Sequence, residues 1–116
     1  MAKHKLLFSP YIAKSHLVFT SGQVYITPEG KLLEGTIQEQ TRQVLKNLEA
    51  VLKKAGVTFA DDVKTTIYVT DMSYYTDVNA AYASYFKEPY PARDTVAVKE
   101  LPLGARVEIS MIAAKD

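Results

Sequence analysis

The last apolar segment of the chain constrains the fold more than any other feature of the sequence. Residues 105–114 alternate as in a β-strand, with the residues of one face apolar throughout. That face carries Val107, Ile109, Met111 and Ala113. Ile112 and Ala114 fall on the other face, and a strand that is apolar on both faces needs cover on both. Helices can cover one side of such a sheet, and a partner subunit is the simplest cover for the other.

The first predicted helix lies between Thr36 and Gly56. Thr36 and Glu39 have the spacing of a capping box, and Gly56 stands where a C-terminal cap belongs. Apolar residues recur between them at helical spacing. They are Ile37, Val44, Leu45, Leu48, Val51 and Leu52, and Thr41 lies on the same face.

A second helix is predicted after Asp71 or Ser73, either of which can cap it. Its stripe consists of Tyr75, Val78, Tyr82, Tyr85 and Phe86. Pro89 and Pro91 then end it.

The remaining segments predict short strands. They cover residues 3–8, 16–19, 24–26, 61–70, 94–99 and 105–114. In residues 61–70, Val63, Thr65, Ile67 and Val69 share one face, and residues 101–104 are expected to form a hairpin-type connection. The predicted order is therefore β-β-β-α-β-α-β-β, an α+β sandwich with both helices on one face of a sheet.

The bulk composition limits the functions open to the chain. Its 116 residues suit a single domain over residues 1–116. A formal net charge of +1 provides no field for nucleic acid or an anionic membrane. No apolar run is long enough to cross a bilayer, the chain begins without a secretory pattern, and there is no cysteine. We expect a cytoplasmic protein with no membrane and no nucleic-acid partner.

The residue types also argue against two common kinds of catalytic site. His4 and His16 are the only histidines, and no spacing typical of zinc ligands surrounds them. Ser21 precedes Gly22 without the glycine pattern of a serine-hydrolase elbow. We therefore expect no metal site and no covalent serine chemistry.

Five polar residues near apolar strands remain as candidates. Arg93 offers a planar fork that can pair with a carboxylate through two hydrogen bonds, although from the local sequence alone a surface ion pair is the better explanation. Glu108 lies in the middle of the last strand, where a carboxylate is solvated, paired or functional. Tyr11, Ser21 and Asn79 are further hydrogen-bonding candidates that could also be structural.

Taken together, several segments make the whole chain resemble the RidA (YjgF) family of reactive-intermediate deaminases. The segments are TSGQ at 20–23, QTRQVLKNL at 40–48, VKTTIYVTDM at 63–72, VN at 78–79, PAR at 91–93 and VEI at 107–109. They follow the family's order at close to its spacing over nearly the full length.

The resemblance implies a chorismate-mutase-like α+β fold that assembles as a homotrimer, with sites in clefts between subunits. It implies a cofactor-independent hydrolase that takes part in metabolite damage control. The reaction would convert 2-iminobutanoate or 2-iminopropanoate, or their enamine tautomers, to 2-keto acids and ammonia.

The resemblance also assigns roles to the candidates. Arg93 would hold the substrate carboxylate, and Glu108 would position or activate the attacking water. Tyr11 matches the tyrosine of a Gly-Pro-Tyr signature, and Ser21 and Asn79 match polar positions near the cleft. All three would bind substrate.

The chain departs from the family pattern around the mouth of this site. Ser9 replaces the glycine before Pro10 and Tyr11, and the loop from there to Ser21 is shorter than usual. Ser110 stands where a second glutamate is often found. Asp94 follows Arg93 and would weaken its hold on a carboxylate if the two paired.

These departures leave two alternatives beside the deaminase. One is a non-catalytic protein that binds or senses small keto acids or amino acids in the same cleft. The other is RNA processing, which the near-neutral charge disfavours.

Overall fold

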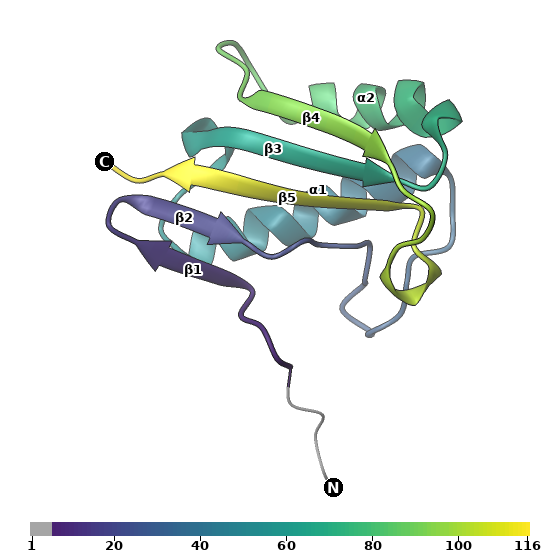
Figure 1. Ribbon diagram of the computed structural model, residues 1–116, viewed down its shortest axis with the longest axis horizontal. Coiled ribbons are helices and arrows are strands. Elements are labelled where there is room, and N and C mark those ends of the chain that lie inside the picture. Colours follow the sequence, from purple (N-terminus) through teal and green to yellow (C-terminus); the bar gives the residue numbers. More distant parts are fainter. Residues whose placement is uncertain (1–5) are drawn as a thin grey trace, which may run out of the picture.

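The computed structural model describes residues 6–116 and places five strands in one sheet, in the order β1-β2-β5-β3-β4. The strands are β1 Tyr11–Lys14, β2 Leu17–Thr20, β3 Asp62–Val69, β4 Ala92–Ala97 and β5 Val107–Ala114. The helices are α1 Ile37–Lys54 and α2 Tyr75–Ala83, with 3₁₀ turns at Phe59–Asp61, Met72–Tyr74 and Pro102–Gly104. β3 and β4 are parallel, and the other pairs are antiparallel (Figure 1).

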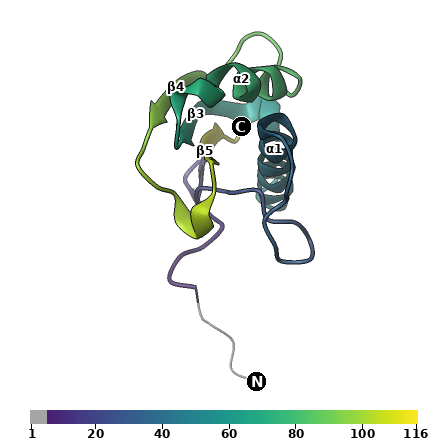
Figure 2. The same cartoon turned by 90° about the vertical axis from the view of Figure 1, so that its right-hand side faces the viewer.

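Both helices lie on the same side of the sheet, as Figure 2 shows from the side. The predicted α+β architecture with two helices on one face is therefore confirmed. The opposite side has no helix over it in the part of the chain that the structure describes. We call this side the open face.

The first helix forms as the sequence predicts. The Thr36 hydroxyl accepts a hydrogen bond from the Glu39 N–H at 3.1 Å, and the Glu39 carboxylate accepts one from the Thr36 N–H at 2.8 Å. Both bonds satisfy N–H groups that the first turn of a helix leaves free. Gly56 follows the helix at φ +83°, a left-handed conformation that costs glycine little.

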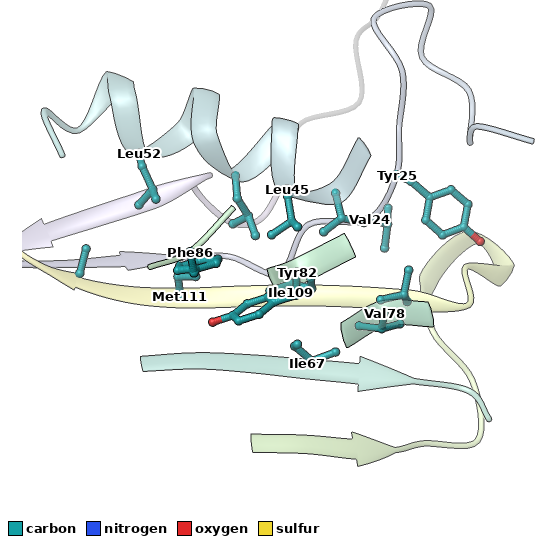
Figure 3. Close-up of a cluster of buried hydrophobic side chains, with 14 of the residues drawn as sticks. Val24, Tyr25, Leu45, Leu52, Ile67, Val78, Tyr82, Phe86, Ile109 and Met111 are labelled. Atoms are coloured by element: carbon teal, nitrogen blue, oxygen red, sulfur yellow. The ribbon is translucent and has the colours of Figure 1, made fainter. Parts of the chain in front are cut away.

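The core lies between the helices and the centre of the sheet (Figure 3). Leu45, Leu48 and Leu52 of α1 are fully buried against the sheet. On β5 the predicted buried face is confirmed, and all four of its residues are at most 2% exposed. Because β5 has a strand on either side, its backbone groups are paired while its side chains seal the core.

The second helix is shorter than predicted. Asp71 caps the 3₁₀ turn that precedes it, through a 2.8 Å hydrogen bond from the Ser73 N–H. α2 begins at Tyr75 and ends at Ala83, well before the prolines. Phe86 lies beyond the helix but is still buried, because its ring stacks on Tyr82 with centroids 4.3 Å apart.

The strands predicted at residues 3–8 and 24–26 are not found in the described residues, whereas the strand predicted at residues 16–19 largely coincides with β2 Leu17–Thr20. Of the strand expected at residues 3–8, residues 3–5 lie outside the described residues and residues 6–8 form no strand. The first hairpin instead joins β1 to β2, with Tyr11 opposite Thr20. Residues 24–26 form no strand either, and their region makes isolated bridges at Gln23 and Ile26.

The expected hairpin between the last two strands was also wrong. β4 pairs with β3 alone and β5 lies on the far side of β3, so the connection through Pro102–Gly104 crosses an intervening strand. In β3 the register shifts between Asp62 and Lys64. This bulge leaves Val63 47% exposed and puts Asp62 among the buried residues instead.

The open face carries apolar side chains from several strands. Ile12 of β1 and Phe19 of β2 are 55% and 40% exposed, and Val96 of β4 is 40% exposed. Ile112 of β5 lies opposite Phe19 on the same face. The described helices include none that is long and apolar enough to span a membrane.

We predict that Leu48→Ala lowers the free energy of unfolding by about 2–5 kcal/mol, because it leaves a cavity between α1 and the sheet. Lys46→Ala on the exposed side of the same helix is the control and should change stability by about 0.5 kcal/mol or less. Denaturant unfolding at a fixed protein concentration measures both. Equal effects of the two variants would contradict this packing.

Candidate functional site

Arg93 lies on edge strand β4 and turns toward the helices. It is opposite Thr65 of β3, a fully buried residue of the helix side. Its guanidinium carbon lies 5.6 Å from the ring centre of Tyr75 and 5.0 Å from that of Tyr82. Nη2 also donates a hydrogen bond to the Tyr75 hydroxyl at 3.1 Å. Two aromatic faces and one hydroxyl thus fix the guanidinium at the sheet edge.

Asn79 belongs to the same neighbourhood. Tyr75, Asn79 and Tyr82 are spaced four and three residues apart on α2 and so share one side of the helix. Two of the three contact Arg93 directly. Asn79 therefore lies on the side of α2 that contacts Arg93, and its role as a site residue stays a prediction.

Asp94 is held away from Arg93. Neighbouring residues of a strand point to opposite faces, so Asp94 lies on the open face. There its carboxylate forms a 2.9 Å salt bridge with Lys64. The expected competition between Asp94 and a ligand carboxylate for Arg93 is therefore not seen.

Glu108 lies on the open face of β5, opposite Tyr68 of β3. Its carboxylate packs against Gly22 in the segment that follows β2. A Cβ atom at position 22 would lie only 2.3 Å from Oε2 of Glu108. Gly22 therefore leaves the space that the Glu108 side chain occupies.

Partial burial raises the pKa of the Glu108 carboxyl above its ordinary value. This shift favours the protonated form more than in an exposed glutamate. A carboxyl tuned in this direction is suited to taking up and releasing a proton closer to neutral pH.

Ser21 and Tyr11 make contacts of their own. The Ser21 hydroxyl donates to the Ser9 carbonyl at 2.6 Å and the Ser21 N–H to the Pro10 carbonyl at 2.9 Å. These bonds fix Ser21 directly before Gly22, the residue against which Glu108 packs. The Tyr11 hydroxyl instead points to the end of α1, where it donates to the Lys54 carbonyl at 3.4 Å.

The candidates therefore fall into separate groups within one chain. Arg93 and Asn79 lie on the helix side at the β4 edge, whereas Glu108 lies on the opposite face of the sheet. Ser21 directly precedes Gly22, against which Glu108 packs, and Tyr11 lies on the helix side near the end of α1. A small ligand held by Arg93 cannot reach Glu108 of the same chain, because the sheet separates them.

Three contributors to the Arg93 site were not among the sequence-based candidates. Tyr75 and Tyr82 were assigned only to the core stripe of the second helix. Thr95 lies two residues after Arg93 and so shares its face, and its buried hydroxyl has no hydrogen-bond partner. The sequence could have indicated Thr95, because a residue two positions after Arg93 on a strand lies on the same face.

Within residues 6–116, no group of three or more histidine, aspartate or glutamate side chains is arranged to hold a metal ion. His4 lies outside the described residues, and the absence of a metal site stays a prediction. What the described groups offer is carboxylate recognition at Arg93 and proton transfer at Glu108.

The sequence matches the model of the family described as endoribonuclease L-PSP over residues 3–115. A RutC family protein of Aquifex aeolicus is 46% identical over 93% of the chain and 88% of its own length. Reactive Intermediate Deaminase A, chloroplastic, of Arabidopsis thaliana is 44% identical over 91% of the chain and 57% of its own length. The human 2-iminobutanoate/2-iminopropanoate deaminase is 37% identical, with 91% and 78% covered.

Solved structures resemble the chain equally closely. A protein of Thermotoga maritima matches with a TM-score of 0.91 and 43% identity, over 94% of the chain and 87% of that protein. RidA from a Psychrobacter species matches with a TM-score of 0.90 and 34% identity, over 97% of the chain and 91% of that protein. TdcF of E. coli, solved with bound serine, matches with a TM-score of 0.90 and 31% identity, over 97% of the chain and 91% of that protein.

We predict that the Glu108 carboxyl titrates at a higher pH than that of Glu39, whose pKa the hydrogen bonds from Thr36 hold below its ordinary value. Carbon-13 NMR of the side-chain carboxyl groups measures both midpoints in one sample. A Glu108 midpoint at or below that of Glu39 would show that the carboxylate is not buried as described.

Proposed function

The chain belongs to the endoribonuclease L-PSP family, also called the RidA or YjgF family, and we propose that it hydrolyses small 2-imino acids to 2-keto acids and ammonia. The observation that carries this proposal is Arg93, a guanidinium held by Tyr75 and Tyr82 with an unpartnered Thr95 hydroxyl on the same face. The Arabidopsis and human relatives bear deaminase names, which support the same reaction.

In the proposed reaction Arg93 binds the carboxylate of the imino acid. A guanidinium pairs with a carboxylate through two parallel hydrogen bonds and so fixes its orientation. The Tyr75 hydroxyl already takes one donor from Nη2, which leaves the other guanidinium N–H groups for the ligand. Thr95 shares the face of Arg93 on β4, and we expect it and Asn79 to contact the rest of a small substrate.

Water completes the reaction without a cofactor. Its oxygen adds to the imine carbon, the C–N bond breaks, and the nitrogen leaves as ammonia while the carbonyl forms. The proton lost from water and the proton gained by nitrogen can pass through one carboxyl group. Glu108 is suited to this role, since partial burial raises its pKa above its ordinary value.

The positions of Arg93 and Glu108 require more than one chain. Because the two residues lie on opposite sides of the sheet, we propose that the site combines Arg93 of one subunit with Glu108 of the next. The exposed Ile12, Phe19 and Val96 on the open face supply apolar area for such an interface. A closed ring of three copies, as the family resemblance implies, would repeat the same contact three times.

A small-molecule reaction suits the chain better than RNA cleavage. The family description names an endoribonuclease, but a net charge of +1 provides no strong overall attraction for a polynucleotide backbone. The non-catalytic alternative drew support from Asp94, which the salt bridge to Lys64 holds away from Arg93. The cellular compartment stays a prediction, and the Arabidopsis relative is named as chloroplastic.

We predict that Arg93→Ala slows imine hydrolysis by about 100-fold, because the substrate loses the contact that orients it. Arg93→Lys should recover little, since an ammonium lacks the planar fork. A threonine dehydratase generates the imine, and its decay is followed above the spontaneous rate. Arg42→Ala, an exposed arginine of α1, is the matched control. Wild-type protein that is as inert as Arg93→Ala would contradict the proposed activity.

A mixing experiment tests the shared site. Glu108→Gln alone should lose activity by about 10²-fold or more. When Arg93→Ala and Glu108→Gln chains are unfolded and refolded together, we expect about a quarter of wild-type activity, because one contact in four joins the two intact residues. Refolding each variant alone is the control. A mixture no more active than its components would contradict a site built from two chains.

A further inference from the structure

A carboxyl group that the proposed reaction does not use is buried behind Arg93. Asp62 begins β3 and is only 7% exposed. Its Oδ1 accepts a hydrogen bond from the Lys64 N–H at 3.3 Å, and its Oδ2 accepts one from the Thr65 hydroxyl. Aspartate is rarely buried this deeply without a cationic partner.

A continuous series of contacts links this carboxyl group to Arg93. The Thr65 hydroxyl, which donates to Asp62, also accepts a 3.0 Å hydrogen bond from the Tyr82 hydroxyl. The Tyr82 ring in turn lies 5.0 Å from the Arg93 guanidinium carbon. Arg93 is also the strand partner of Thr65. The path therefore runs from Asp62 through Thr65 and Tyr82 to Arg93.

The other groups near Asp62 do not neutralise it. β5 provides Ala113 as its register partner, and α2 provides Tyr82, whose ring stacks on Phe86. The neighbouring Asp61 carboxylate already accepts from the Thr58 N–H. Burial outweighs the hydrogen bonds from Thr65 and Lys64 and raises the pKa of Asp62 to about 7.

We propose that Asp62 is a positioning residue for Arg93, and that its protonation state, relayed through Thr65 and Tyr82, makes the binding of a carboxylate ligand depend on pH. The inference rests on the proposed function in one respect, since it takes the ligand of Arg93 to be a small carboxylate. The link between Asp62 and Arg93 itself requires no ligand.

The two protonation states differ in the direction of the hydrogen bonds. With Asp62 ionised, Tyr82 donates to Thr65 and Thr65 donates to Asp62. A phenol that donates has a more electron-rich ring, which attracts the guanidinium more strongly. Protonated Asp62 can donate to Thr65, and Thr65 can then donate to Tyr82. This reversal weakens the hold of the ring on Arg93.

Protonation of Asp62 should therefore strengthen carboxylate binding for two reasons. It frees Arg93 to turn toward the ligand, and it removes a buried negative charge from the vicinity of an anion. Affinity should rise as the pH falls through the pKa of Asp62. A shared site would also bring Glu108 of another subunit close to the ligand, so the contribution of Asp62 must be separated from that of Glu108.

Calorimetry with pyruvate, a 2-keto acid that stays ionised throughout, provides the first test. Between about pH 8 and pH 6 we expect wild-type affinity to rise about fivefold, within the range typical of coupling between two sites. Asp62→Asn keeps Glu108 and should bind pyruvate with little dependence on pH. Tyr82→Phe keeps both Glu108 and the Asp62 carboxyl, so it should lose the part of the pH dependence that the hydroxyl relay carries and keep the part due to the buried charge. Tyr82→Phe also keeps the ring over Arg93. Glu49→Gln, an exposed carboxyl of α1, is the control and should behave as wild type.

NMR titration of the ligand-free protein provides the second test and is independent of the proposed function. We expect the Asp62 carboxyl, the Tyr82 ring carbon that bears the hydroxyl, and the Arg93 Nε to share one midpoint, and the last two to lose it in Asp62→Asn. An Asp62 midpoint in the ordinary carboxyl range, or Tyr82 and Arg93 signals that ignore it, would overturn the proposal. Pyruvate that binds at no pH would reject the proposed ligand, and the NMR titration would still decide the coupling.

Discussion

The pairing of β5 with β3 at the centre of the sheet determines where every other group lies. Ile109 faces Ile67 in this register, and both are fully buried beneath the helices. Because side chains alternate along a strand, burial of Ile109 sends Glu108 to the open face. A slip of one residue would expose the apolar side of β5 and bury a carboxylate, so core packing and site placement share one constraint.

The same alternation makes a single chain insufficient for the proposed chemistry. Arg93 points to the same side of the sheet as its strand partner Thr65, which is buried beneath the helices. Glu108 points to the same side as its strand partner Tyr68, which is the open face. No rotamer change brings the two together through a hydrogen-bonded sheet. Assembly would then create the site rather than merely stabilise it. The apolar open face and the divided site are thus two consequences of one register.

Patterns of neighbouring residues in the sequence predicted those features of the fold that depend on local interactions. The capping box at Thr36 and the buried face of β5 were predicted correctly, because cap geometry and strand alternation depend on neighbouring residues. The hairpin expected between the last two strands was predicted wrongly, since pairing of β4 with β3 rather than β5 is set by contacts between distant segments. Val63 was assigned to the same face as Thr65 and Ile67, because a bulge cannot be seen in an alternating pattern. The same bulge buries Asp62, and no pattern in the sequence singles this residue out.

Asp62 shows how the energetics of the core can point to function. A group whose pKa is raised by folding contributes stability that is present at low pH and is lost as the pH rises through the folded-state value, here about 7. An apolar residue at this position would avoid that loss, since the surrounding side chains belong to the core or contact it. This loss of stability arises at Asp62, from which hydrogen bonds through Thr65 lead to the Tyr82 ring that contacts Arg93. A buried acid placed there is better explained by its influence on Arg93 than by any contribution to packing.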